Sequence, residues 1–239
     1  MLKINTITKT YNKTFVAVDE ISMQIEPGQI VGFIGPNGAG KTTTLNMITG
    51  VLKQDSGTIQ INGYDTLENP LESKNEFGFV GDSPDSFLKL KGIEYLNFIA
   101  DVYGIDTETR KQRILEYSQS LEMEASLNDR IASYSHGMRQ KIMVIAVLLH
   151  DPNILILDEP LTGLDPKSSY TLKEIMKKRA ADGKSVLFST HVLEVAEKLC
   201  DQIVIINKGH ILYTGTLETL KAQYEGLSLE EIFLEVTGR

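Results

Sequence analysis

The chain has 239 residues, of which 41% are hydrophobic and 23% charged, an ordinary composition for a globular protein that can bury a sizeable core. Its 24 basic and 32 acidic residues give a net charge of −8, which is the wrong sign for a protein whose main task is to grip nucleic acid or an anionic membrane by electrostatics. Cys200 is the only cysteine, which excludes an internal disulfide and a thiolate metal cluster and suits a reducing compartment; we expect it to be a small buried side chain.

The N-terminal part is predicted to be rich in strands. Residues 1–8 alternate as a strand does and lack the continuous apolar core of a signal peptide. Residues 2–34 alternate over two stretches and turn at 26–29, which predicts an antiparallel sheet leading into a buried strand at 30–34. A further strand is predicted at 58–61, followed by a turn.

A phosphate-binding loop of the form Gly-x-x-x-x-Gly-Lys-Thr lies between the strand at 30–34 and a helix predicted at 41–47. Its glycines let backbone N–H groups and the helix N-terminus face the phosphates. Lys41 adds a positive charge near the β- and γ-phosphates, and the Thr42 hydroxyl is a ligand for Mg²⁺. The sequence therefore predicts that the protein binds a nucleoside triphosphate. The predicted contacts are Gly35, Pro36, Asn37, Gly38, Ala39, Gly40, Lys41, Thr42 and Thr43.

From about residue 90 to 149 the apolar residues take helical spacing, which predicts a helical lobe. The longest apolar run, at 142–149, is far shorter than the roughly 20 residues that span a bilayer, so we expect any membrane role to come through a partner. Within the lobe, Ser135 suits a helix N-cap and Gly137 a close approach of the backbone. This segment has no evident reason to touch the chain's own nucleotide.

After Pro152 buried strands alternate with helices, which predicts a largely parallel sheet. The strands are expected at 154–157, 186–189 and 203–206, the helices at 167–181 and 192–199, and two short helices in the tail at 216–239. No repeat or Pro/Ser-rich linker divides the chain. We expect one domain, with a catalytic core at 1–89 and 151–215, a helical insertion at 90–150 and the tail.

Catalytic side chains are predicted where these strands end. Asp158 and Glu159 follow a buried strand, and a parallel sheet can place them beside the phosphate loop. Asp158 would hold Mg²⁺ through water, and Glu159 would orient and deprotonate the attacking water. His191 follows another strand of the same sheet and could reach the γ-phosphate or that water.

This set of motifs, in this order, resembles the ATP-binding subunits of ABC transporters over essentially the whole chain. The motifs are the phosphate loop, the helical lobe, Ser135-His136-Gly137, Asp158-Glu159, Leu161-Thr162-Gly163-Leu164-Asp165 and Ser189-Thr190-His191. The resemblance implies an α/β fold of the P-loop NTPase class, with a RecA-like mostly parallel sheet, an N-terminal antiparallel β subdomain and an inserted helical subdomain.

The resemblance also implies roles for residues outside the phosphate loop. Tyr11 would stack on adenine, so the cofactors would be ATP and Mg²⁺. In this family two ATPase domains pair head to tail, so Ser135 and Gly137 would serve the nucleotide of a second subunit. Asp165 would join the two sites across the interface.

The sequence departs from the family pattern at two places. The usual signature is Leu-Ser-Gly-Gly-Gln, whereas this chain has His136 and Met138 at the third and fifth positions; this variant, with the tail at 228–235, resembles the subgroup that powers two-component exporters of the ABC-2 type. In addition, Asp82 aligns where the family has a glutamine that touches Mg²⁺. Asp82 is either a metal ligand through water or a solvated loop aspartate, and the sequence leaves both open.

We therefore expect an ATP-hydrolysing subunit at the cytoplasmic face of a membrane, docked on an integral membrane permease through residues 82–90 and the helical lobe. The alternative is a non-transport ABC ATPase that acts on DNA or the ribosome. The resemblance implies a different layout for such proteins, which have long insertions or two ATPase domains in one chain. We therefore expect no direct nucleic-acid partner. A P-loop GTPase or kinase would explain the phosphate loop but not the Ser135 segment, and residues 207–210 lack the aspartate that reads guanine. The cargo, and whether the second ATPase subunit is an identical copy, stay open.

Overall fold

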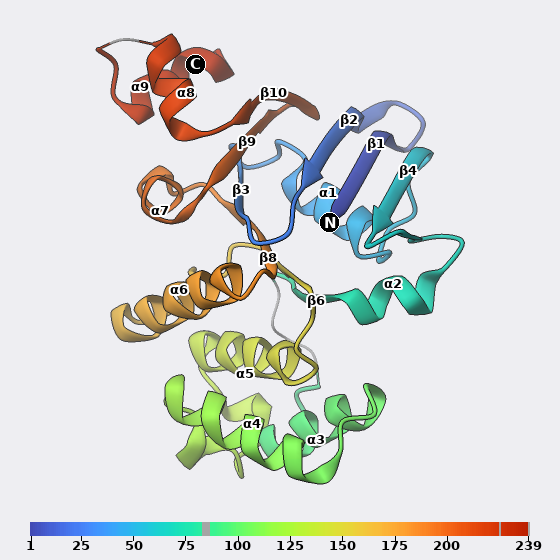
Figure 1. Ribbon diagram of the computed structural model, residues 1–239, viewed down its shortest axis with the longest axis vertical. Helices are drawn as coiled ribbons and strands as arrows, with labels where there is room; N and C mark the ends of the chain where they lie inside the picture. The colour runs from blue at the N-terminus through green and yellow to red at the C-terminus, as the bar shows by residue number, and fades with distance from the viewer. Residues whose placement is uncertain (83–86, 225, 239) are drawn as a thin grey trace.

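The computed structural model describes residues 1–82, 87–224 and 226–238, and its strands form two sheets (Figure 1). The smaller sheet is antiparallel and has the order β2-β1-β4-β5. Its strands are β1 (Leu2–Tyr11), β2 (Phe15–Ile25), β4 (Ser56–Ile61) and β5 (Tyr64–Asp65). The antiparallel N-terminal sheet predicted from the alternating pattern is confirmed.

The larger sheet has the order β10-β9-β3-β8-β7-β6, and all its neighbouring pairs except β10 with β9 are parallel. Its strands are β3 (Ile30–Ile34), β6 (Phe77–Val80), β7 (Ile154–Leu157), β8 (Ser185–Thr190), β9 (Gln202–Asn207) and β10 (His210–Gly215). Every residue of β3, β7 and β8 is buried, which is why these strands read as continuous apolar runs in the sequence. The predicted mostly parallel sheet is confirmed, and β6 and β10 extend it beyond the prediction.

The two faces of the larger sheet are covered by different layers. Alternate residues of β7 separate cleanly, because Ile154 and Ile156 pack with α1 and the antiparallel sheet, whereas Leu155 and Leu157 pack with the helices that follow β6. A third apolar cluster joins Ile203 on β9 to the C-terminal helices. Figure 1 shows the antiparallel strands on one side of the molecule and the helical segment on the other.

The helices follow the predicted pattern. The helices beside the sheet are α1 (Lys41–Ile48), α2 (Pro70–Glu76), α6 (Pro166–Ala181) and α7 (Leu193–Leu199). The helical lobe contains α3 (Gly92–Val102), α4 (Thr107–Ser120) and α5 (His136–Leu149), with short 3₁₀ turns at Glu124–Ser126 and Ile131–Ser133. The tail contains α8 (Leu217–Gln223) and α9 (Leu229–Thr237). The helical insertion and the two tail helices were expected, and α2 was not. The division into units with boundaries at 89/90, 150/151 and 215/216 stays a prediction.

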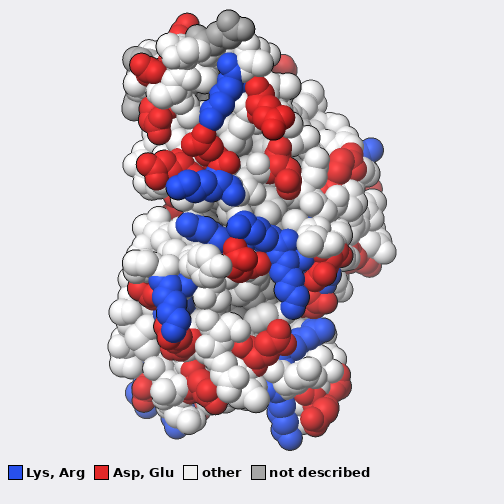
Figure 2. All heavy atoms as spheres, turned by 60° about the vertical axis from the view of Figure 1, so that its left-hand side comes forward, with Lys and Arg blue, Asp and Glu red and all other residues white. Residues whose placement is uncertain are grey.

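Across 1–82, 87–224 and 226–238, none of the helices is both long enough and apolar enough to cross a bilayer. Charged side chains of both signs are interspersed over the face in Figure 2. Ion pairs such as that between Lys177 and Glu174, 3.0 Å apart, reflect the same mixing.

The sheet register decides where the candidate site lies. Within the parallel sheet Ile34 is paired with Thr190, and Leu157 with Phe188, so β3, β7 and β8 end at one edge. The segments that leave this edge are the phosphate loop (residues 35–42), the pair Asp158-Glu159, and Thr190-His191. The fold therefore gathers segments that are far apart in the sequence.

Candidate active site

The phosphate loop is shaped by two glycines that admit no side chain. A Cβ on Gly35 would lie 2.4 Å from the carbonyl oxygen of Ile206, and a Cβ on Gly40 would lie 2.6 Å from that of Ala17. Gly40 also has φ of 108°, in the left-handed region that favours glycine. Gly40 is the N-cap residue of α1, and among the described residues no side chain caps this end of the helix. The first N–H groups of α1 therefore face the loop and are available to an anion.

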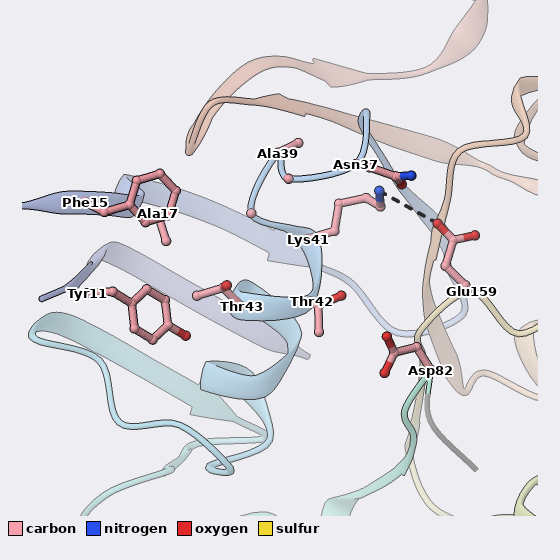
Figure 3. A pocket seen from close by; sticks show the side chains of 12 residues that line it. Tyr11, Phe15, Ala17, Asn37, Ala39, Lys41, Thr42, Thr43, Asp82 and Glu159 are labelled. Atoms are coloured by element: carbon pink, nitrogen blue, oxygen red, sulfur yellow. Dashed lines mark ion pairs between the residues drawn. The ribbon is translucent and has the colours of Figure 1, made fainter. Parts of the chain in front are cut away.

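A pocket of about 290 Å³ lies over this loop (Figure 3). Tyr11 and Phe15 form one side of it, the start of α1 lies in the middle, and Asp82 and Glu159 form the other side. The pocket therefore has an aromatic end and an end with charged groups, a polarity that matches a nucleotide with its base at one end and its phosphates at the other. Its lining residues are Tyr11, Phe15, Ala17, Asn37, Gly38, Ala39, Gly40, Lys41, Thr42, Thr43, Asp82 and Glu159.

Lys41 supplies the positive charge at the phosphate end. Its side chain is only 8% exposed, and Nζ donates hydrogen bonds to the carbonyl oxygens of Gly35 at 2.8 Å and Pro36 at 3.3 Å. Glu159 Oε1 lies 3.7 Å from the same Nζ (Figure 3). A cation held by carbonyl dipoles and one carboxylate can interact with a phosphate without moving far.

Ser189 contacts both of the acidic residues that follow β7, the first through its carboxylate and the second through its backbone. Its buried hydroxyl donates to Asp158 Oδ1 and accepts a hydrogen bond from the backbone N–H of Glu159 at 2.9 Å. Asp158 is 1% exposed, and its Oδ2 has no hydrogen-bond partner among the residues of the described chain. A buried carboxylate oxygen without a donor suits an ordered water or a hydrated cation.

Glu159 and His191 contact each other. His191 Nδ1 lies 3.0 Å from Glu159 Oε2, and the His191 side chain is 54% exposed. Glu159 adopts φ of 47°, a left-handed conformation that is uncommon for a residue with a side chain. The structure thus brings together the predicted catalytic residues Lys41, Glu159 and His191.

The residues predicted to hold Mg²⁺ are compatible with that ion. Thr42 and Asp82 line the pocket, and the unpartnered Oδ2 of Asp158 is available at the end of β7. No group of three or more His, Cys, Asp or Glu side chains able to hold a metal occurs in the part of the chain that the structure describes. Mg²⁺ commonly takes one or two protein ligands and completes its shell with waters and phosphate oxygens, which fits this sparse set.

Gly35 and Pro36 of the phosphate loop do not line the pocket, and three predicted contacts outside that loop lie elsewhere. Among the described residues that line the pocket, Ser135, Gly137 and Asp165 are absent. Ser135 is exposed at the N-cap of α5, where its hydroxyl accepts from the N–H of Met138 at 3.2 Å, and Asp165 is the N-cap of α6. The structure therefore does not bring these residues to the chain's own pocket, as expected if they serve a second molecule.

Besides Ala17, which also lines the pocket, two residues of the site could not be identified as individual contacts from the sequence. Phe15 is paired with Tyr11 across the β1–β2 hairpin and is 60% exposed at the pocket. Ser189 was recognised only as the first residue of a motif, without a role. No local pattern marks either residue, because both act through the register of neighbouring strands.

The sequence profile described as ABC transporter matches residues 18–162. The chain is 37% identical to the ABC transporter ATP-binding protein NatA of Bacillus subtilis over 93% of this chain and 91% of that protein. It is 36% identical to the ABC-type transporter ATP-binding protein EcsA of the same organism, over 99% and 96% respectively. It is 30% identical to the Nod factor export ATP-binding protein I of Cupriavidus metallidurans, over 98% of this chain and 77% of that protein.

Solved structures give the same result. An ATP-binding subunit of an ABC transporter superposes with a TM-score of 0.94 at 32% identity, over 99% of both chains. A dimeric ATP-binding cassette in a post-hydrolysis state, bound to ADP and Pi, superposes with a TM-score of 0.81 at 26% identity, over 91% of this chain and 99% of that one.

Proposed function

This chain belongs to the ABC transporter family, as an ATP-binding subunit, and from that membership we propose that it hydrolyses ATP to drive a separate membrane permease in export. The observation that carries the proposal is the position of the Glu159 carboxylate, which contacts Lys41 and His191 at the phosphate end of the pocket. The export direction is supported by the signature variant and by the similarity to a Nod factor export ATP-binding protein.

The chain's own groups would divide the chemistry among them. Lys41 would stabilise negative charge on the β- and γ-phosphates, and the N–H groups at the start of α1 would do the same along the loop. Glu159 Oε would accept a proton from the attacking water, and His191 would hold that carboxylate in place through Nδ1. Mg²⁺, held by Thr42 and through water by Asp158, would neutralise phosphate charge when bound. Asp82 is proposed to contact that hydration shell through water.

We propose that ATP joins two subunits head to tail. Ser135, Gly137 and Asp165 lie outside the chain's own pocket, which supports a role for Ser135 and Gly137 at a second subunit's nucleotide and for Asp165 at the interface. The N-terminus of α5, which begins at His136, would then point its N–H groups at a γ-phosphate. ADP lacks that group, so closure would require ATP.

A groove of about 240 Å³ supports docking of a membrane partner. Val51, 69% exposed, lies at its edge, and the groove is lined mainly by apolar and aromatic side chains. Its lining residues are Thr49, Val51, Lys74, Phe77, Phe79, Tyr95, Ile99, Tyr103, Ala146, Val147 and His150. We propose that it receives a cytoplasmic segment of the permease, placing the protein at the cytoplasmic face of the membrane. The other predicted contact, residues 82–90, lies in part outside the described residues, at 83–86.

The decisive experiment is Glu159→Gln. Removing the base should slow ATP hydrolysis by roughly 10²–10⁴-fold, while ATP binding persists because Lys41 and the loop are intact. Light scattering should then show dimers with Mg²⁺ and ATP but monomers with ADP. Glu108→Gln, an exposed glutamate on α4 outside the pocket, is the matched control and should hydrolyse ATP as the parent does.

Two results would sink the proposal. One is a Glu159→Gln protein that hydrolyses ATP at the parental rate, and the other is one that binds ATP but stays monomeric. ATP hydrolysis stimulated by DNA or ribosomes instead of by a permease would favour the alternative class.

A further inference from the structure

The start of α5 is packed directly against the segment that joins β7 to α6. That segment, residues 161–165, is here called the linking loop. The His136 ring lies over Gly163, where an added Cβ would come within 2.6 Å of the ring carbon Cδ2. One residue on, a Cβ on Gly137 would lie 2.5 Å from the carbonyl oxygen of Gly163. Gly137 cannot gain a side chain without separating α5 from the linking loop, whereas a side chain at Gly163 would displace the His136 ring.

An ion pair closes the same contact one turn further along α5. Lys141 Nζ lies 3.0 Å from Asp165 Oδ2, with the Lys141 side chain 10% exposed. Among the described residues, Lys141 forms its ion pair with Asp165. A largely buried ammonium without its carboxylate would be costly, so this pair is expected to hold α5 and the N-cap of α6 together.

Asp165 keeps its charge over the pH range in which a protein of this kind is folded. Hydrogen bonds from the hydroxyl and backbone N–H of Ser168, and then from Lys141, hold the pKa of its carboxyl well below the usual range. The same carboxylate therefore caps α6 and receives the Lys141 ammonium. The contact between α5 and the linking loop does not depend on a proton.

The other end of the linking loop leads to the pocket. The N–H of Thr162 donates to the carbonyl oxygen of Glu159 at 3.1 Å, and the N–H of Leu164 to that of Leu161 at 3.4 Å. Glu159 lines the chain's own pocket, whereas Ser135 precedes His136 at the exposed start of α5. A continuous set of contacts therefore runs from Ser135 to the backbone of Glu159.

We propose that His136 and Lys141 are positioning residues that tie the linking loop to the first turns of α5. The inference rests on the proposed function, in which Ser135 contacts the nucleotide of a second subunit. When that nucleotide binds Ser135, α5 carries Asp165 with it through Lys141, and carries the main chain beside Glu159 through His136 and Gly163. Each subunit thereby senses whether its neighbour's pocket is filled.

The test uses the hydrolysis-impaired Glu159→Gln protein as its parent. Lys141→Met removes the charge and keeps the length of the side chain, and His136→Ala removes the ring. Both changes should raise the ATP concentration for half-maximal dimer formation, Lys141→Met by roughly tenfold, which lies within the coupling measured between residues in contact. Lys141→Arg should restore the parental value. Affinity for a fluorescent ATP analogue at protein concentrations that keep the chain monomeric should not change.

A second measurement reads the contact without any dimer. Hydrogen exchange of the linking-loop amides in the nucleotide-free monomer should be faster in Lys141→Met and in His136→Ala than in the parent. Adding Asp165→Asn to Lys141→Met should change exchange little further, because the pair is already broken.

The outcomes separate the two proposals. Parental exchange and parental dimer formation in Lys141→Met would overturn the inference and leave the proposed function standing. Faster hydrogen exchange in Lys141→Met with parental dimer formation would also overturn the inference, because the contact between α5 and the linking loop would then have no effect on dimer closure. A loss that Lys141→Arg fails to restore, accompanied by weaker binding at the chain's own pocket, would mark a general packing defect and also overturn it. If the Glu159→Gln parent never dimerises with ATP, the proposed function fails, and faster exchange in both variants would still support the tie itself.

Discussion

Adjacent carboxylates in this site have different environments because of one hydroxyl. Ser189 donates a hydrogen bond to the Asp158 carboxylate and accepts one from the backbone N–H of Glu159, so it holds one carboxylate directly and only the main chain of the other residue. Asp158 is 1% exposed, whereas the Glu159 side chain is 21% exposed and faces the pocket. Asp158 is therefore suited to hold a hydrated cation, and Glu159 to act on water that enters from solvent.

The aromatic end of the pocket gives a test at the residue scale. Tyr11→Ala should weaken ATP binding by roughly fivefold or more, since stacking on a base contributes about 1–3 kcal/mol, whereas Tyr11→Phe should keep most of the affinity. Titration with a fluorescent ATP analogue measures both. Phe15→Ala is the matched control across the hairpin and should have the smaller effect; the reverse ranking would make Phe15 the contact to adenine.

How far single residues could be predicted depends on whether their signal is local. The residues of the phosphate loop were identifiable because spacing alone encodes them, and the structure places most of them around one pocket. Ser189 and Phe15 depend on which residues face each other across β7–β8 and β1–β2. Such register follows from packing of whole strands and leaves no mark within a short stretch of sequence.

At the scale of elements, the C-terminal end of α5 is fixed by an aromatic stack and a polar contact. The His150 and Tyr103 rings are 3.8 Å apart and inclined by 8°, and His150 Nε2 lies 3.2 Å from the carbonyl oxygen of Phe77. Burial lowers the pKa of His150 from 6.5 to about 4. The imidazole is consequently neutral in the folded protein at neutral pH, and it joins the helical lobe to β6.

This shift predicts an acid-sensitive stability. The unfolded chain takes up a proton at His150 near the ordinary pKa of 6.5, whereas the folded chain does so only near 4. The contribution of His150 to the free energy of unfolding is therefore present above about pH 6.5 and is lost as the pH falls toward 4. Between pH 7.5 and 5 the parent should lose about 2 kcal/mol more of its unfolding free energy than His150→Gln. Urea unfolding at the two pH values measures this, and parallel losses in both proteins would contradict it.

Long elements were predictable and short ones were not. The strand at 154–157 and the helix ending at Ala181 stand out through apolar runs and helical spacing. β6 (Phe77–Val80) has four residues including a glycine, and α2 has seven and begins with a proline, so neither offers enough periodicity. β10 alternates between exposed and partly buried residues and is placed by its pairing with β9.

At the scale of the whole molecule, the half-buried Cys200 reports on the integrity of the central sheet. A Cβ on Gly32 of β3 would come within 2.6 Å of the Cys200 sulfur, so the thiol is seated directly against the strand that leads into the phosphate loop. Burial raises the pKa of this thiol to about 12, which leaves almost no thiolate at neutral pH. The expectation of a small buried side chain is met only in part, because Cys200 packs against the core but is half-buried.

Alkylation of Cys200 should therefore proceed only through unfolding. Iodoacetamide is expected to leave the native protein unlabelled over a time in which urea-unfolded protein is fully labelled, as mass spectrometry would show. Mg²⁺ and ATP at about 100 times Kd should add about 2.7 kcal/mol of stability and slow labelling by roughly 100-fold if opening is global. Rapid labelling of the native protein would mean that α7 separates from β3 without unfolding.

The two-sheet architecture with its helical insertion was predictable from the whole chain because strands, helices and motifs agree with one another. What the sequence could not provide was the packing between segments, such as the seat of His136 over Gly163. That contact joins the first residue of α5 to the linking loop, and neither segment has a sequence pattern that identifies the other.

The left-handed backbone of Glu159 sets stability and chemistry against each other at a single position. A residue with a side chain held at φ of 47° carries a conformational cost of the order of 1 kcal/mol that glycine would avoid. Selection for a sturdier protein alone would therefore favour glycine there, and selection for turnover would favour the carboxylate. An engineer who stabilises this chain by relaxing its backbone should leave position 159 untouched and look for gains at surface turns that the nucleotide never reaches.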